Sequence, residues 1–488
     1  MFPRVFAVLF LTLSACSFDL PRSAPEAQGV SSAAVLDFVG ELDRTVHDMH
    51  SMMLLRHGQV IAEGWWAPYE PDAPHTLWSL SKSFTSTAIG IAIGEGKLSV
   101  DDEVLKFFPE DAPAEPSKNL KLMRVSDLLR MVTGQQTEPV HPPGDLSKKA
   151  FLAHPVPFKP GTHFLYNTNA TYMLSAIVQK VTGQTTLEYL RPRLFEPLGF
   201  KDPHWLSSSE GINFGGYGLS LRTEEIARFG QLLLQKGQWQ GKQLVPAEWI
   251  EAASARQVSN GSNPKSDWDQ GYGYQFWRCR HGAFRGDGAF GQYCVVMPEQ
   301  DAVLVITSGI KDMQHPLDLV WEKLLPAMKA EALPANEEAA AKLKERLKSL
   351  SLTLSQLPSQ AAFGSLGKKF VFPANDRNLE ALTLSHSQKD HLNELTVRFN
   401  GVDQRIPFGR DKWTTTRLTW DKRPEQPVAA LGWETGPDAF AVKLCFIESP
   451  DELTIVLTAT TDGNLHYNAE WNIGFKPTKE PELIGKPE

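Results

Sequence analysis

Short apolar stretches occur at both ends of the first two thirds of the chain and predict strands there. Residues 51–56 and 60–66 read as two strands, and His57-Gly58-Gln59 between them reads as a hairpin turn. Strand-like segments return at 272–278, 291–297 and 302–307. An amphipathic helix is expected around 317–325.

The region between these strands has helical periodicity. Four helices are expected, each followed by glycine, at 79–93, 125–132, 169–181 and 223–235. Glycine suits the left-handed position that commonly ends a helix. Sheet at both ends with helices inserted between predicts an α+β domain whose terminal segments share one sheet.

A second unit is expected after about residue 335. Asn336 can cap a helix at 337–347. Alternating β-rich runs then follow at 394–399, 413–420, 440–447 and 453–460. Asn400-Gly401 and Asp462-Gly463 have hairpin-turn composition. We therefore predict a main domain at 17–330, a helical linker at 331–360 and a small all-β domain of unknown role at 361–488.

The N-terminus has the pattern of an export signal. Arg4 precedes an apolar run at 5–13, which is too short to span a bilayer but suits the apolar part of a signal peptide. Leu13-Ser14-Ala15-Cys16 resembles the lipobox of bacterial lipoproteins, whose cysteine is acylated. We expect residues 1–16 to be the signal segment and lipobox, and the exported protein to be lipid-anchored through Cys16, at the periplasmic face of the outer membrane. An apolar core helix is the alternative.

Composition narrows the functional classes. The 488 residues are 42% hydrophobic and 22% charged, which is ordinary for a globular protein and excludes a disordered chain. The formal net charge is −8, so no summed positive field attracts nucleic acid. His163, His204 and His281 show no ligand spacing, which argues against a metal site. No cofactor is predicted, and the oligomeric state stays open.

Three cysteines remain beyond Cys16. Cys279 and Cys294 lie in strand-like segments on either side of a glycine-rich turn, so a cross-strand disulfide is one reading. Two buried thiols are the other. Cys445 lies in an apolar strand and is expected in the core.

One Ser-x-x-Lys motif stands out from the four in the chain. A lysine three residues after a serine on a helix lies on the same face and can take the hydroxyl proton. Ser262, Ser308 and Ser365 start such motifs among turn residues or at a strand end. Ser79, with Lys82, opens a long helix. Its hydroxyl would then lie at the positive end of the helix dipole.

The surrounding motifs resemble those of the β-lactamase-related serine hydrolases. This superfamily includes class C β-lactamases, D-Ala-D-Ala carboxypeptidases, family VIII esterases and 6-aminohexanoate-dimer hydrolases. The resemblance rests on segments that occur in the same order, at 78–86, 95–102, 125–134, 159–169, 216–230 and 286–292. It covers residues 25–328 and implies a β-lactamase/transpeptidase-like fold, with an antiparallel sheet flanked by helices and an all-helical subregion.

The resemblance also implies catalytic roles. Ser79 would be the acylated nucleophile, Lys82 the base and Tyr166 the proton relay to the leaving group. The backbone N–H groups of Ser79 and Ala289 would bind the oxyanion.

Two positions depart from the family pattern. Thr168 stands at the third position of the Tyr-x-Asn motif, with Asn169 next to it. Gly286-Asp287-Gly288 replaces the Lys-Thr-Gly of class C enzymes, so no lysine is available there for a substrate carboxylate. Thr168, Asn169, Asp287, Gly288 and Tyr217 are the expected substrate-binding residues.

These observations predict a serine hydrolase that acts on small esters or amides through an acyl-enzyme at Ser79. The first alternative is a D-Ala-D-Ala carboxypeptidase or β-lactamase acting on cell-wall-type substrates. The second is a non-catalytic binding or sensor lipoprotein.

Overall fold

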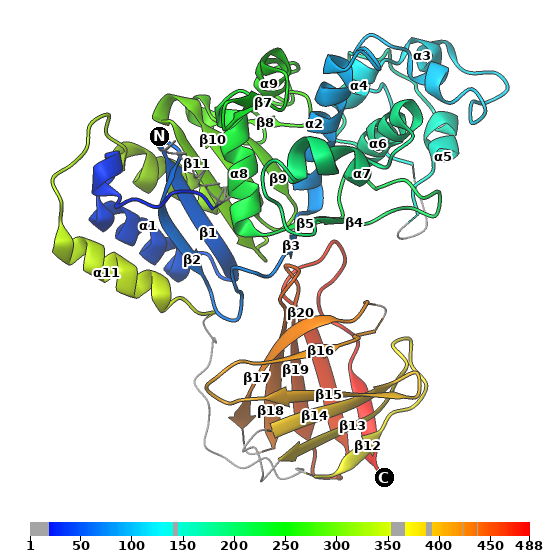
Figure 1. Ribbon diagram of the computed structural model, residues 1–488. Helices are drawn as coiled ribbons and strands as arrows, with labels where there is room; N and C mark the ends of the chain where they lie inside the picture. Colours follow the sequence, from blue (N-terminus) through cyan, green and yellow to red (C-terminus); the bar gives the residue numbers. More distant parts are fainter. Residues whose placement is uncertain (1–18, 140–144, 353–366, 387–392, 422, 437) are drawn as a thin grey trace, which may run out of the picture.

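The computed structural model describes residues 19–139, 145–352, 367–386, 393–421, 423–436 and 438–488 (Figure 1). The predicted signal peptide and Cys16 lie outside these residues. Within the described part of the chain, no helix combines the length and apolarity needed to cross a bilayer.

The predicted hairpin and the late strands form one antiparallel sheet. β1 (Met49–Arg56) pairs with β2 (Gln59–Trp65) on one side and with β11 (Ala302–Ser308) on the other. The six-strand order is β2-β1-β11-β10-β9-β8. The remaining strands are β10 (Gln292–Met297), β9 (Phe284–Gly288) and β8 (Trp277–Arg278). The prediction that distant segments share a sheet is confirmed.

One predicted strand is mostly loop. Of residues 272–278 only the last two form β8, and the hydrophobic pattern alone did not predict β9. Gln275 has a φ of 67°, which interrupts an extended run. Its side-chain amide donates to the carbonyl of Leu129 at 2.9 Å, so this loop is tied to the helical region.

Both faces of the sheet are covered by helices, so β1 is buried along its whole length. α8 (Thr223–Leu234) packs against β1, β10 and β11. α1 (Ser32–Thr45), α10 (Gln314–Leu319) and the π-helical turn Val320–Leu324 share a second apolar core with the sheet. α11 (Glu337–Lys348), which falls in the predicted linker, packs on α1 and β2.

The helical region is built around α2 (Ser81–Gly94), which is buried at nearly every residue and continues from a 3-10 turn, Trp78–Leu80. α6 (Thr168–Thr182) crosses it, and Gly183 ends α6 in the left-handed conformation, as expected. The other helices are α3 (Lys118–Leu122), α4 (Val125–Leu129), α5 (Lys148–Ala153), α7 (Thr186–Leu190) and α9 (Ala247–Ser254). Short strands are β3 (His75–Thr76), β4 (His204–Trp205), β5 (Leu219–Leu221), β6 (Gln238–Trp239) and β7 (Lys242–Gln243).

The C-terminal region is a ten-stranded antiparallel sheet that curls into a nearly closed barrel (Figure 1). Its first and last strands in the sequence pair side by side, with Phe370 opposite Pro487. Asn400 and Gly401 have φ values of 49° and 76°, as the hairpin turn requires. The strands are β12 (Lys369–Val371), β13 (Leu379–His386), β14 (Asn393–Phe399), β15 (Val402–Phe408), β16 (Thr414–Leu418), β17 (Gln426–Gly436), β18 (Ala439–Phe446), β19 (Glu452–Ala459), β20 (Leu465–Trp471) and β21 (Leu483–Pro487).

The barrel contacts the main body through hydrogen bonds and a half-buried ion pair. The Thr76 N–H donates to the carbonyl of Glu448 at 2.9 Å. Lys443 Nζ lies 2.5 Å from Glu452 Oε2 and 3.6 Å from Asp48 Oδ1 of the main body. Thr76 lies just ahead of Ser79, so this contact fixes the barrel beside the start of α2.

The disulfide reading of the cysteines is wrong, because Cys279 and Cys294 are free, buried thiols. Cys294 belongs to the core shared with α8, where its Sγ lies 3.7 Å from the carbonyl of Ile226. Cys279 belongs to the core on the opposite face of the sheet. The sheet therefore separates the two thiols. Cys445 is a buried free thiol, as expected.

Candidate active site

Ser79 and Lys82 lie on one face at the start of the buried helix. Ser79 is in the 3-10 turn and is partly exposed, whereas Lys82, one turn later, is 1% exposed. Lys82 Nζ lies 3.1 Å from Ser79 Oγ. This is hydrogen-bond distance for a proton transfer between the two groups.

Among the described residues, the hydrogen-bond partners of the Lys82 amine are neutral oxygen atoms. Nζ donates to the carbonyl of Gly216 at 2.9 Å and to Thr168 Oγ1 at 3.3 Å. Burial lowers the pKa of Lys82 to about 7, although the carboxylates of Glu138 and Asp287 oppose the shift. A neutral amine, which can accept a proton, is therefore available near neutral pH.

Tyr166 packs over the same two residues. Lys82 Nζ lies 4.9 Å from the centre of the Tyr166 ring. Trp277 stacks on this ring with centroids 5.2 Å apart. Burial raises the pKa of Tyr166 above its ordinary value, and a hydrogen bond with the Ser79 side chain opposes the rise. The phenol thus stays protonated at neutral pH.

Glu138 is a site residue that the sequence analysis did not identify. Its Oε2 accepts hydrogen bonds from the Thr168 N–H at 2.9 Å and from Asn169 Nδ2 at 3.1 Å. Thr168 contacts Lys82 directly, so Glu138 fixes the helix start that carries this contact. No motif marks the residue, because it lies in a loop 30 positions before Thr168.

Two glycines allow strand β9 to approach the turn that carries Ser79. A Cβ at Gly288 would lie 2.0 Å from the carbonyl oxygen of Leu77 and 3.1 Å from Trp78 Cβ. A Cβ at Gly286 would lie 2.4 Å from Leu80. Ala289 follows Gly288 directly, and its carbonyl is held by Gln292 Nε2 at 3.2 Å. The strand end that carries Ala289 therefore lies beside the turn that carries Ser79.

A buried ion pair flanks Gly286, the residue that stands in place of the lysine of the Lys-Thr-Gly motif. Arg285 is 0% exposed, and its Nε and Nη2 lie 2.9 and 2.8 Å from Asp287 Oδ2. Nη1 donates to the carbonyl of Asp267 at 2.7 Å. Burial raises the pKa of Asp287, and Arg285 opposes this rise. The arginine charge is thus neutralised within its own strand.

The chain also matches a known protein family. The β-lactamase family model matches residues 43–319, more than half of the chain. The chain belongs to the β-lactamase family. Its members hydrolyse amide, peptide or ester bonds, so this chain is a hydrolase of the same superfamily.

Relatives of the β-lactamase family agree with this assignment. The 6-aminohexanoate-dimer hydrolase of Paenarthrobacter ureafaciens is 28% identical over 299 residues, covering 57% of this chain and 76% of that protein. The lovastatin esterase of Penicillium rubens is 25% identical and covers 28% of this chain and 40% of its own. A penicillin-binding protein homologue from Caulobacter crescentus has the same fold, with a TM-score of 0.51, 18% identity and coverage of 63% and 98%.

Tyr217 is next in sequence to a residue of the β-lactamase-family site. It follows Gly216, whose carbonyl binds Lys82, but its ring stacks on Phe214 with centroids 4.5 Å apart. Among the described residues, no ring contact joins Tyr217 to Tyr166. The other expected residues, Thr168, Asn169, Asp287 and Gly288, lie around Ser79 and Lys82 as described above.

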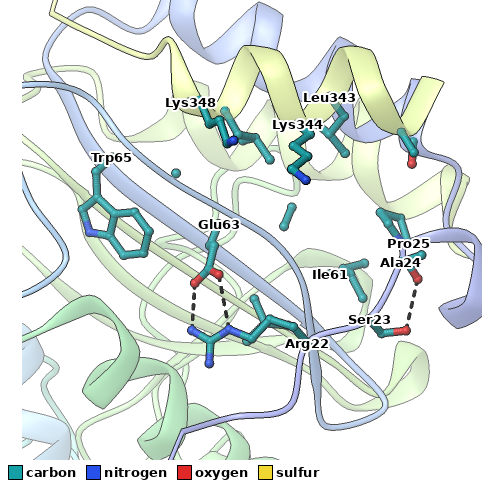
Figure 2. A pocket seen from close by; sticks show the side chains of 16 residues that line it. Arg22, Ser23, Ala24, Pro25, Ile61, Glu63, Trp65, Leu343, Lys344 and Lys348 are labelled. Carbon is teal, nitrogen blue, oxygen red and sulfur yellow. Dashed lines mark hydrogen bonds and ion pairs between the residues drawn. The ribbon is translucent and has the colours of Figure 1, made fainter. Parts of the chain in front are cut away.

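A large cavity lies elsewhere. It has a volume of about 710 Å³ and lies between β2, α11 and the segment around Arg22 (Figure 2). Glu63 and Trp65 project into this region from the sheet edge, and Leu343 and Lys344 from the helix. None of Ser79, Lys82 and Tyr166 lines it, so it is separate from the β-lactamase-family site. Across the described ranges, no cluster of three or more His, Cys, Asp or Glu side chains could hold a metal ion.

The close approach of β9 yields the first prediction. Gly288→Ala places a methyl group against the Leu77 carbonyl and displaces the strand from Ser79. Because displacements of about 1 Å in a catalytic site can cost on the order of a hundredfold in rate, we expect about that loss in kcat/KM for a chromogenic ester. Gly40→Ala on α1 is the control, since its Cβ would have nothing within 4 Å. Equal activity of the two variants would contradict the role of the close approach.

Proposed function

We propose that the protein hydrolyses small, neutral esters or amides through an acyl-enzyme at Ser79. The observation that carries this proposal is the buried Lys82 amine, 3.1 Å from Ser79 Oγ and with a pKa lowered to about 7. A serine hydroxyl needs such a base to attack a carbonyl carbon.

The proposed reaction has two halves. Neutral Lys82 takes the Ser79 proton while Oγ attacks the substrate carbonyl carbon. The backbone N–H groups of Ser79 and Ala289 bind the oxyanion that forms. Tyr166 passes its proton to the departing alcohol or amine and takes one from the Lys82 ammonium, so that the amine is neutral again. Water then attacks the acyl carbon while Lys82 takes a proton from it. The bond between Ser79 Oγ and the acyl carbon breaks, Lys82 returns the proton to Oγ, and the acid leaves.

The charge distribution supports a neutral substrate. A substrate carboxylate gains about 1.5–3 kcal/mol from a hydrogen bond to a cation. Arg285, the cation of β9, already binds Asp287 and the Asp267 carbonyl. This argues against the carboxypeptidase and β-lactamase alternative. The non-catalytic alternative is disfavoured because Ser79, Lys82 and Tyr166 are present and lie together.

The base assignment predicts a pH profile. Below a pH of about 7 Lys82 is charged and cannot accept a proton, so kcat/KM for a neutral ester rises with pH and levels off above about 7. Glu138→Gln should shift the midpoint of this pH profile to lower pH, because the Glu138 carboxylate raises the pKa of Lys82.

The assignment of Ser79 and Lys82 also predicts the effect of removing each side chain. Ser79→Ala and Lys82→Ala should each lose turnover, and a fluorophosphonate probe should label wild type but not Ser79→Ala.

Two results would count against this mechanism. Labelling of Ser79→Ala at the wild-type rate would place the nucleophile elsewhere. A profile that is flat between pH 5 and pH 9 would exclude Lys82 as the titrating base.

The buried Arg285–Asp287 pair predicts substrate choice. We expect kcat/KM to be at least tenfold higher for short neutral esters than for a chromogenic cephalosporin or a D-Ala-D-Ala peptide, since Arg285, the cation of β9, is already paired with Asp287. Specificity constants for all three on purified protein lacking residues 1–16 decide the question. A preference for either carboxylate substrate would show that another cation reaches the site.

We also propose that the protein is exported and lipid-anchored, on the basis of Leu13-Ser14-Ala15-Cys16. In a Gram-negative host the full-length protein should enter the detergent phase, because several acyl chains on Cys16 bind a membrane stably. Cys16→Ala should keep its signal peptide, as mass spectrometry of the N-terminus can establish. Cleavage of Cys16→Ala at the same bond as wild type would rule out lipobox processing.

A further inference from the structure

A loop of the C-terminal barrel places an aromatic ring beside the site. Phe475 lies in the loop between β20 and β21 and is 76% exposed. Its ring nevertheless lies 5.5 Å from the Trp78 ring and 5.0 Å from the Phe290 ring, centroid to centroid. Trp78 and Phe290 contact each other edge to face at 5.5 Å. We call these three residues the aromatic cluster.

The aromatic cluster adjoins both proposed oxyanion groups. Trp78 directly precedes Ser79, and Phe290 directly follows Ala289. Both aromatic residues have left-handed backbone conformations, with φ values of 48° and 68°. Such conformations are costly for bulky residues and persist where surrounding contacts hold them. The turn geometry that presents the two N–H groups is thus coupled to the packing of these rings.

The Phe475 loop is hydrogen-bonded both to the main body and to the rest of the barrel. Asn472 Nδ2 donates to the carbonyl of Gly309 in the main body at 3.2 Å and to that of Pro450 in the barrel at 3.0 Å. Asn472 Oδ1 accepts from the Glu452 N–H at 2.8 Å. Ile473 is 3% exposed. These contacts hold the chain just before Phe475, and the barrel end bearing this loop faces the body (Figure 1).

We infer that Phe475 is a specificity-determining residue, whose exposed face packs against an aromatic group of the ester or amide bound at Ser79. This inference rests on the proposed function and adds the substrate class. The Phe475 ring is exposed and touches residues beside the reaction site. Burying such a ring against a flat apolar group lowers the free energy of the complex. The barrel thereby supplies part of the substrate site.

The test compares three esters that differ in where a ring is placed. Ethyl acetate has none, ethyl phenylacetate has one on the acyl side, and phenyl acetate has one on the leaving side. For wild type we expect a higher kcat/KM for at least one aromatic ester than for ethyl acetate. In Phe475→Ala the ratio of kcat/KM for that aromatic ester to kcat/KM for ethyl acetate should fall roughly tenfold. This is the scale of a lost apolar contact in a pocket.

Matched variants separate packing from folding. Val402→Ala removes an exposed apolar side chain from the β14–β15 hairpin of the same barrel and should leave the ratio unchanged. Phe475→Leu keeps an apolar side chain without the flat ring, so its ester ratio should lie between those of Phe475→Ala and wild type. Labelling of Ser79 by a small ethyl fluorophosphonate should be equal in wild type and Phe475→Ala.

A binding measurement separates this inference from the proposed function. In a Ser79→Ala background, which cannot turn over substrate, Phe475→Ala should raise the Kd of the preferred aromatic ester about tenfold. An unchanged Kd or an unchanged ester ratio would overturn the role of Phe475. Absence of fluorophosphonate labelling in wild type would overturn the acyl-enzyme at Ser79, while the Kd comparison would still decide the aromatic contact.

Discussion

The removal of Lys82 from water is the constraint on which the site depends. An ammonium group in solvent holds its proton well above neutral pH, so a lysine becomes a useful base only where the charged form is penalised. Here the penalty comes from burial at the start of α2, with a backbone carbonyl and a hydroxyl group as partners. Glu138 and Asp287 limit the effect, so their distance from Nζ sets the balance between protonated and neutral amine.

That burial requires three separate segments to meet around one helix. α6 brings Thr168, the loop before β5 brings Gly216, and β9 approaches through glycines that leave no room for side chains. The sheet fixes β9, and α8 on its face fixes the sheet. The pKa of one amine therefore depends on how the main body packs as a whole.

Local patterns in the sequence identified the elements whose signals are local. The hairpin at 51–66, the helix after Ser79, and the Asn400-Gly401 turn carry their own periodicity or turn residues, and the structure contains them. The family resemblance brought Ser79, Lys82 and Tyr166 together from distant segments. The substrate-binding roles assigned to Thr168, Asn169, Asp287, Gly288 and Tyr217 stay predictions.

Four features depended on tertiary packing and were not visible in the sequence. Most of 272–278 forms a loop because Gln275 bonds to the distant α4 rather than to a neighbouring strand. Cys279 and Cys294 face opposite sides of the sheet, which composition cannot reveal. Glu138 lies at the site because it accepts a hydrogen bond from the start of α6. Phe475 lies there because the docked barrel places its ring against Trp78.

The strand order has a consequence for how the protein is made. The second partner of β1, after β2, is β11, with Met49 opposite Ser308, and the two halves of the barrel sheet are joined by the pairing of β12 with β21. Each sheet thus needs a strand that is synthesised long after its pairing partner. Contacts between residues so far apart in the sequence form slowly. Until then the apolar faces of α2 and β1 stay uncovered, a state prone to aggregation. A chain interrupted before β11 therefore lacks the central partner of β1, and one interrupted before β21 has the main sheet without the β12–β21 pair of the barrel.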